Sequence, residues 1–326
     1  MADKIRTGMI GCGGIAHGHV RRLLEVPEAE IVALNDISQD SIARMHDAIP
    51  ETRGLPVFDD YREMLDKVEM DAVEIATPHT LHFQQAMDSI DRGLHILLEK
   101  PMVCQVAHAE ELIAHAKEKD RIIVLSYQRH YQPQFRYMKK VIDQGQIGQV
   151  TFVSALQCQG WKTGTAGKWR QDPALSGGGQ LNDSGSHLID IILWTTGLAV
   201  SEVHGYIDNC GTPVDINSAL SLKFGNGAQG TVSVVGDAPC FYEDFTIWGE
   251  NGMLFYRNGQ LSHCGPDGKI FQPEDMPEGG DPDKNLIDAI LGRDVVWSPP
   301  ICGRRVIELT EAAWKSAQLG KPVQVG

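Results

Sequence analysis

Residues 4–16 read KIRTGMIGCGGIA, and this stretch decides the fold of the N-terminal half of the chain. It begins as an apolar strand, turns at its glycines and runs into residues 15–26, whose apolar side chains have helical spacing. The turn has the form G-x-G-x-x-A. In a strand–turn–helix unit, Gly11 permits the tight turn, Gly13 the close approach of a pyrophosphate, and Ala16 the packing of helix on strand. The motif by itself also allows the alternative, a glycine-rich turn that binds no ligand.

The second strand, residues 31–36 (IVALND), ends in an acid, and this favours the dinucleotide interpretation. Asp36 at that place can accept both ribose hydroxyls of NAD, and its charge repels the 2′-phosphate of NADP. Ser38, just beyond, would tolerate either cofactor. Together with the glycine turn, Asp36 predicts a bound dinucleotide, NAD rather than NADP.

Short apolar strands and helical patterns continue to alternate as far as residue 125, which predicts a doubly wound parallel sheet of the Rossmann type. After about residue 126 the rhythm changes to consecutive strands joined by GNG, GEN and RNG, which is typical of an antiparallel sheet. The prediction is an α/β dinucleotide-binding domain, 1–125, followed by a substrate-binding and oligomerisation domain, 126–326. The second domain is expected to be α+β, with a large open, mainly antiparallel sheet and two closing helices near 283–291 and 303–319.

Composition excludes several classes of partner. The formal net charge of -14 argues against nucleic acid and anionic membrane surfaces, and no apolar run approaches the roughly 20 residues that cross a bilayer. The N-terminus leaves no room for a signal peptide, and the seven cysteines form no C-x-x-C pair, so a cytoplasmic protein without structural disulfides or zinc is expected. No metal site is predicted, since His17 and His19 are two apart on a helix and face different ways.

Two further stretches carry candidate chemistry. LLEKPM, residues 97–102, places Glu99 and Lys100 at the carboxyl end of an apolar strand, where ligands of open α/β sheets bind; the alternative is a solvated ion pair. GGGQLNDSGSH, residues 177–187, precedes the apolar run LIDIILW. It is read either as a turn before a helix capped by Ser184 or Ser186, or as backbone cleared for a substrate ring.

These segments together resemble the glucose–fructose oxidoreductase/inositol dehydrogenase (Gfo/Idh/MocA) family. The resemblance rests on GCGGIA, ATPHTLH, GLHILLEKPM, YQRHYQPQF and GGGQLNDSGSHLID with its D-x-x-x-H core, and it extends to the closing AAWKSAQLGKPVQV. The family implies that Lys100 lies beside the nicotinamide and the reacting carbon. It implies that His187 is the general acid/base, for which an imidazole is suited. Asp183 is expected to orient the substrate or the lysine.

Several of these assignments leave alternatives. Asp183 and His187 lie on one helix face only if the helix already includes Asp183. The alternative interpretation of His187 is a buried structural histidine. His82 would read as an exposed residue of a proline-initiated helix. Arg129 would read as a domain-interface ion pair, and Trp161 as simple packing.

The resemblance also implies two sets of binding residues. The cofactor set is Gly11, Gly13, Gly14, Ile15, Asp36, Ile37, Thr77, Pro78, His82, Glu99, Lys100 and Gln128. The substrate set is Arg129, Trp161, Lys162, Trp169, Arg170, Asp183 and His187, because aromatic faces and charged donors suit a polyhydroxylated ring.

The expected function is an NAD-dependent oxidoreductase that takes hydride from a ring hydroxyl of a sugar or cyclitol. Lys100 would stabilise the alkoxide and His187 would transfer the proton. The alternatives are a non-catalytic dinucleotide- and sugar-sensing regulator, and a redox-assisted lyase or glycosidase with recycled NAD. An open antiparallel sheet has a face to bury, so a homodimer or homotetramer is expected.

Overall fold

The computed structural model describes residues 4–326, which form two compact units. The first comprises residues 4–103, Ala107–Gln128 and Gly280–Ile301; the second comprises Cys104–Val106, Arg129–Gly279 and Cys302–Gly326. The sequence places everything after residue 125 in the second domain, whereas Gly280–Ile301 belongs to the first unit. The physical reason is burial, because Leu286 and Ile287 of this segment pack in the core of the first unit.

The first unit is built on a parallel six-stranded sheet in the order β3-β2-β1-β4-β5-β6, as expected for a Rossmann fold. The strands are β1 (Ile5–Ile10), β2 (Ala29–Asn35), β3 (Val57–Phe58), β4 (Ala72–Ile75), β5 (His95–Leu98) and β6 (Ile123–Leu125). The order reverses between β1 and β4, and ligands of such sheets bind beyond the carboxyl ends of the strands at this switch point.

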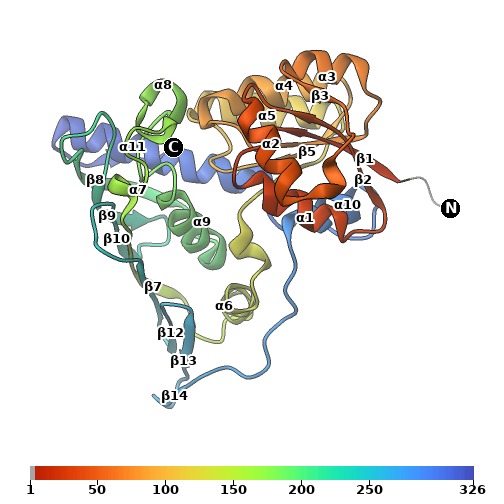
Figure 1. Ribbon diagram of the computed structural model, residues 1–326. Coiled ribbons are helices and arrows are strands. Elements are labelled where there is room, and N and C mark those ends of the chain that lie inside the picture. The colour runs from red at the N-terminus through yellow and green to blue at the C-terminus, as the bar shows by residue number, and fades with distance from the viewer. Residues whose placement is uncertain (1–3) are drawn as a thin grey trace. The chain divides into compact units, whose positions relative to one another are not determined.

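Helices cover both faces of this sheet. The helices α1 and α10 lie together on one face, and α3 and α4 lie on the other (Figure 1). Gly93, with φ of 79°, ends α4 in the left-handed conformation that the sequence predicts. The helices are α1 (Ala16–Leu24), α2 (Gln39–Ala48), α3 (Tyr61–Lys67), α4 (His82–Asp91), α5 (Val106–Glu118) and α10 (Pro282–Ile290), with short 3₁₀ turns at Pro50–Thr52, His79–Leu81 and Gln128–Tyr131.

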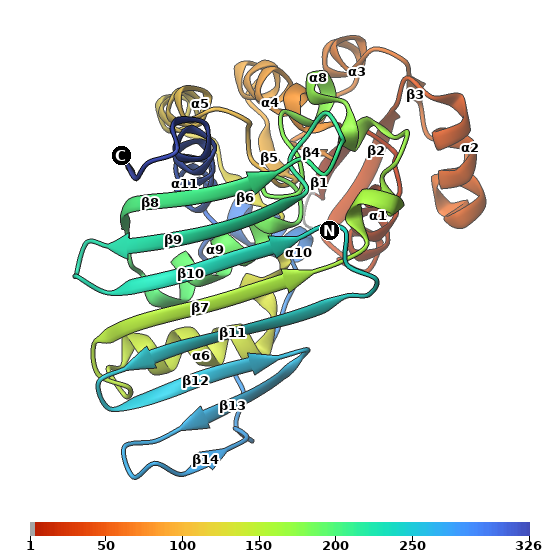
Figure 2. The ribbon, with the colours of Figure 1, turned by 90° about the vertical axis from the view of Figure 1, so that its left-hand side faces the viewer.

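The second unit contains a nine-stranded sheet in the order β14-β13-β12-β11-β7-β10-β9-β8-β15, seen face-on in Figure 2. Among the described residues β7 and β10 are its one parallel pair, so the expectation of a mainly antiparallel sheet is confirmed. The strands are β7 (Val150–Cys158), β8 (Val200–Asp208), β9 (Asn217–Phe224), β10 (Gln229–Val235), β11 (Tyr242–Gly249), β12 (Gly252–Arg257), β13 (Gln260–Cys264), β14 (Ile270–Phe271) and β15 (Val323–Gln324).

The two faces of this sheet differ in chemistry. One face is apolar, with a buried row across β9, β10, β7 and β11 made of Leu220, Val232, Ala155 and Phe245. Helix α9 (Gly185–Thr196) packs on β7 from this side, with α6 (Pro133–Asp143) beside it (Figure 2). The opposite face is mixed: Ser221, Thr231 and Ser154 lie in register across β9, β10 and β7, and Phe152 of β7 contacts Trp248 of β11 edge to face.

The remaining helices of the second unit are α7 (Trp161–Gly164), α8 (Pro173–Ser176) and the long α11 (Pro300–Leu319), with a 3₁₀ turn at Trp169–Gln171. Gly205 of β8 donates its backbone N–H to Ser316 of α11 at 3.1 Å. Over residues 4–326, no helix is both long and apolar enough to cross a membrane.

Candidate active site

The glycine turn after β1 has the geometry of a phosphate-binding loop. Gly11 has φ of 91°, and a Cβ there would lie 2.8 Å from the carbonyl oxygen of Ala76, so glycine is required. A Cβ at Gly13 or Gly14 would meet nothing within 4 Å, so the backbone of these residues borders open space. The loop therefore offers backbone N–H groups at the start of α1 to an anion without a side chain in the way.

Asp36 follows β2 and is fixed by the same loop. One carboxylate oxygen accepts the backbone N–H of Cys12 at 2.8 Å and the other accepts that of Ser38 at 2.8 Å. Each oxygen keeps a lone pair for a further donor, and the residue is half-buried. Ile15 and Ile37, 46% and 88% exposed, leave apolar surface beside it. The site thus offers a loop that binds an anion, a carboxylate that accepts hydroxyl groups and an apolar surface. The phosphates, the ribose and the adenine of a dinucleotide need these three features, so the residues fit NAD.

Glu99 and Lys100 stand at the carboxyl end of β5, as predicted. Glu99 is 5% exposed, and its Oε2 accepts the backbone N–H of Lys100 at 3.2 Å. The Nε2 of Gln128 lies 3.4 Å from Oε1 of Glu99 and donates to Ser126 at 2.8 Å. Glu99 is therefore an internal anchor of this strand end and not the solvated ion-pair partner of the alternative interpretation.

His82 is buried, which contradicts the alternative of an exposed residue at a helix start. Its Nδ1 lies 2.9 Å from the carbonyl oxygen of Pro101 and its Nε2 lies 2.9 Å from that of Thr77. Burial lowers the pKa of His82, and the two carbonyls oppose that shift. The ring therefore ties the segment after β4 to the segment after β5. Thr77 and Pro78 remain half-exposed at the end of β4, where a cofactor would pass.

In the second unit, Asp183 is the centre of a polar cluster. The carboxylate is 5% exposed, and its Oδ2 accepts Nε1 of Trp161 at 2.8 Å and Nε of Arg170 at 2.9 Å. The Arg170 guanidinium also lies 4.4 Å from the ring centroid of Trp169. Trp161 is buried, so packing describes it correctly, but its indole nitrogen also holds the carboxylate. Four residues of the predicted substrate set thus meet around one carboxylate.

Helix α9 begins at Gly185, after Asp183, so Asp183 and His187 do not share a helix face by periodicity. The capping prediction is wrong, because the Ser184 side chain makes no cap hydrogen bond and the Ser186 hydroxyl donates to the carbonyl of Asp183 at 2.6 Å. His187 is half-buried.

The glycines before this helix serve the fold. A Cβ on Gly178 would lie 2.5 Å from the Trp314 ring, and one on Gly179 would lie 1.9 Å from the carbonyl oxygen of Asp215. The Asp215 carboxylate accepts the backbone N–H groups of Gly179 at 2.9 Å and Leu181 at 2.8 Å. The prediction that the glycines clear space for a substrate ring is therefore wrong for Gly178 and Gly179. Their neighbours are Asp215 and Trp314, which no local sequence signal identifies.

Two basic residues of the predicted substrate set bind protein groups within the second unit. Arg129 pairs with Glu243 at 2.5 Å and is not a domain-interface ion pair, while Gln157 donates to the same oxygen at 3.2 Å. Lys162 donates from Nζ to the carbonyl of Cys210 at 2.6 Å. Both cations keep further N–H donors, so these bonds hold the side chains in place without excluding contact with a substrate.

Within residues 4–326, metal-binding residue types gather at two buried places, His19–Glu74–Asp283 and His130–Asp190–Cys302. In the first, Arg22 already neutralises Asp283, with Nε 2.5 Å from Oδ2. In the second, His130 bonds to Asp190 at 2.8 Å and stacks on Trp194 with a centroid separation of 4.2 Å. Both arrangements favour ion-pair networks over metal sites.

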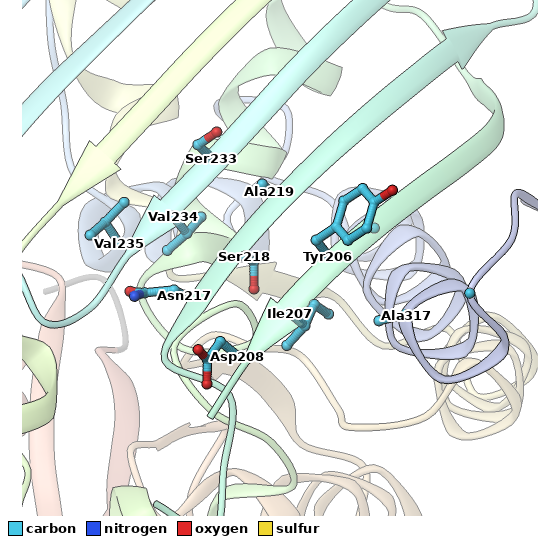
Figure 3. A pocket seen from close by; sticks show the side chains of 12 residues that line it. Tyr206, Ile207, Asp208, Asn217, Ser218, Ala219, Ser233, Val234, Val235 and Ala317 are labelled. Atoms are coloured by element: carbon cyan, nitrogen blue, oxygen red, sulfur yellow. The ribbon is translucent and has the colours of Figure 1, made fainter. Parts of the chain in front are cut away.

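A cavity of about 510 Å³ lies along β8, β9 and β10 of the second unit, beside α11 (Figure 3). Tyr206, Asn217 and Ser233 line it, together with Ala317 of α11. None of the predicted catalytic or binding residues lines this cavity, so the volume of a cavity does not identify the predicted substrate site in the second unit.

Comparison with known proteins agrees with this geometry. The family model for the Gfo/Idh/MocA oxidoreductase family with an NAD-binding Rossmann fold matches residues 5–127, and the family's C-terminal domain model matches residues 135–255. An uncharacterised oxidoreductase of Bacillus subtilis, YrbE, is 25% identical over 85% of this chain and 81% of its own. The myo-inositol 2-dehydrogenase of Thermotoga maritima is 23% identical over 78% of this chain and 75% of its own.

A solved structure shares the fold over almost its whole length. Levoglucosan dehydrogenase, in complex with NADH and L-sorbose, superimposes with a TM-score of 0.88 at 20% identity and covers 99% of both chains.

Proposed function

Because the chain belongs to the Gfo/Idh/MocA family of NAD-binding oxidoreductases, we propose that it oxidises a ring hydroxyl of a sugar or cyclitol. The observation that carries the proposal is Lys100, set at the carboxyl end of β5 with its backbone N–H on the buried Glu99 carboxylate. A lysine whose backbone is held at the ligand-binding edge of a Rossmann sheet is suited to bring its ammonium to negative charge on a reacting oxygen.

The N-terminal unit binds NAD. In our assignment the backbone from Gly11 to Ile15 holds the pyrophosphate and the Asp36 carboxylate accepts the adenosine ribose hydroxyls. The charge of Asp36 also supports a preference for NAD over NADP. Bound NAD supplies the hydride acceptor.

His187 is our candidate for the group that removes the hydroxyl proton, because an imidazole changes protonation near neutral pH. Asp183 is our candidate for orienting the substrate hydroxyls. Trp161 and Arg170 fix its carboxylate, and the half-exposed Arg170 and Trp169 offer a cation and an aromatic face to a polyhydroxylated ring. The inositol and levoglucosan dehydrogenases among the relatives support a cyclic polyol as the substrate class.

The test is a panel of cyclitols and sugars with NAD, in which NADH formation is followed by absorbance and NAD binding by calorimetry. We expect turnover of at least one cyclic polyol, and loss of turnover in Lys100→Ala and His187→Ala with NAD affinity retained. Lys67→Ala, whose exposed ammonium pairs with Glu63 on α3 and lies outside both predicted binding sets, is the matched control and should leave kcat unchanged.

Tight NAD binding without turnover of any polyol would contradict the proposal and favour a sensor. Product release without net NADH would favour a redox-assisted lyase. Near-normal kcat in either alanine variant would remove that residue from the mechanism.

A further inference from the structure

A buried histidine, His19 on α1, lies at the centre of a charged network in the first unit. Its side chain is 1% exposed. Nδ1 lies 2.8 Å from Oδ1 of Asp283 on α10, and Nε2 lies 3.1 Å from Oε1 of Glu99 at the end of β5. A carboxylate oxygen at hydrogen-bond distance from each ring nitrogen favours a proton on both, which is the imidazolium form.

The other charged groups around His19 act in both directions. The Arg22 guanidinium can only donate, so its contact with Nδ1 opposes a proton there, whereas Asp283 favours one. Arg22, on the same helix, lies 3.0 Å from Nδ1 through Nη2, and its Nε contacts both Asp283 at 2.5 Å and Asp281 at 4.0 Å. Glu74 on β4 approaches Nδ1 to 3.7 Å. Burial and the neighbouring Asp283 raise the pKa of Glu74 well above its usual range, which favours its neutral form.

The pKa values agree with the geometry. Burial opposes a charge on His19, but Asp283 and Glu99 outweigh it and raise its pKa to about 10. Burial likewise opposes the Glu99 carboxylate, and the hydrogen bond and charge of His19, with the charge of Lys100, bring the pKa of Glu99 well below its usual range.

We propose that His19 is a positioning residue of the active site, which holds Glu99 as the carboxylate that fixes Lys100 at the end of β5. This inference rests on the proposed role of Lys100. Glu99 accepts the backbone N–H of Lys100 through one oxygen and faces His19 through the other. His19 lies one turn into the helix that begins at the phosphate loop, so the network joins the loop to the catalytic strand end.

The first test is the pH profile of kcat in His19→Gln, with active sites counted by NAD-binding stoichiometry. Glutamine keeps a hydrogen-bond donor but removes the charge, and burial then raises the pKa of Glu99. We expect kcat at pH 7 to fall at least about tenfold, and to fall further as the pH is lowered through the new ionisation of Glu99. Glu99→Gln should have a similar effect, and the double variant should be no worse than either single one.

His115→Gln is the matched control, because His115 makes an equally short 2.8 Å contact with Asp91 outside this network. It should leave the kcat profile unchanged. A kcat loss in His19→Gln that is independent of pH, or additive with Glu99→Gln, would overturn the proposal, since a merely structural histidine would behave in that way.

Two measurements do not depend on turnover and so separate this proposal from the proposed function. Nitrogen-15 NMR of the His19 ring in the wild-type protein should show an imidazolium throughout pH 5.5–8.5. Competitive acetylation at pH 8 should modify Lys100, relative to Lys162, about threefold faster in His19→Gln than in wild type, because loss of the Glu99 charge favours the neutral amine. A ring that titrates near its ordinary pKa, or an unchanged labelling ratio, would refute the role of His19 even if no substrate were found.

Discussion

Gly179→Ala provides a stringent test of the structure around Asp183. The new Cβ would lie 1.9 Å from the carbonyl oxygen and 2.5 Å from the nitrogen of Asp215, and both are backbone atoms that no rotamer change can move. Overpacking of this kind costs about 1–3 kcal/mol. A shift of Asp215 would also weaken the hydrogen bonds of its carboxylate to Gly179 and Leu181, and a bond to a charged group contributes about 1.5–3 kcal/mol.

The expected destabilisation is therefore about 2.5–6 kcal/mol, if one of the two bonds is lost in full. For a domain of 150–250 residues about 2–4 °C of Tm corresponds to each kcal/mol, so the second unit should melt roughly 5–24 °C lower. Urea denaturation and differential scanning calorimetry measure this.

Gly164→Ala is the control, because a Cβ there meets nothing within 4 Å and its φ is not positive. Its Tm should stay within about 2 °C of wild type. If Gly179→Ala were as stable as Gly164→Ala, the argument that the Asp215 backbone requires a glycine at this position would be wrong.

Three further predictions follow from the described contacts. Asp36→Ala should narrow the ratio of kcat/KM for NAD over NADP, and an unchanged ratio would show that Asp36 does not select the cofactor. Ala219→Arg places a charge on the exposed face of the second sheet, between Tyr206 and Ser233 in register, and should shift the protein towards monomer in light scattering; an unchanged mass would count against a sheet-to-sheet dimer. The pKa of His19 is raised to about 10, so its contribution to the unfolding free energy is complete below its unfolded-state pKa near 6.5 and is lost as the pH rises through 10. The wild-type unfolding free energy, measured in urea, should therefore decline between pH 7 and 10, and this decline should be smaller in His19→Gln.

The Rossmann sheet was predictable because its signals are local. The strand, the glycine turn and the helix of residues 4–26 are contiguous, and each has a periodicity or a backbone requirement of its own. Asp36 could be assigned because it follows the next strand directly. The same reasoning identified Lys100, since a strand that ends in a parallel sheet places its last residues at the ligand-binding edge.

Long-range contacts explain what the sequence did not indicate. Gly179 was interpreted from its neighbours in the chain, whereas Asp215 determines its environment. His19 was interpreted only as the second of two histidines on a helix, because its partner Asp283 is 264 positions away. The periodicity of a sequence indicates which side chains are buried. It does not indicate which residues, distant in the chain, they contact in the fold.

The return of Gly280–Ile301 to the first unit has a consequence for how this chain is made. Leu286 of α10 packs on Ala72, Leu97 and Val124 of β4, β5 and β6, so this part of the sheet face stays uncovered until α10 has been synthesised. At about 5–20 residues per second, the ribosome needs roughly 10–35 s to travel from the end of Ala107–Gln128 to the end of Gly280–Ile301. During that interval the strands β4, β5 and β6 of the nascent unit lack the cover that Leu286 provides, so an apolar patch stays exposed to solvent.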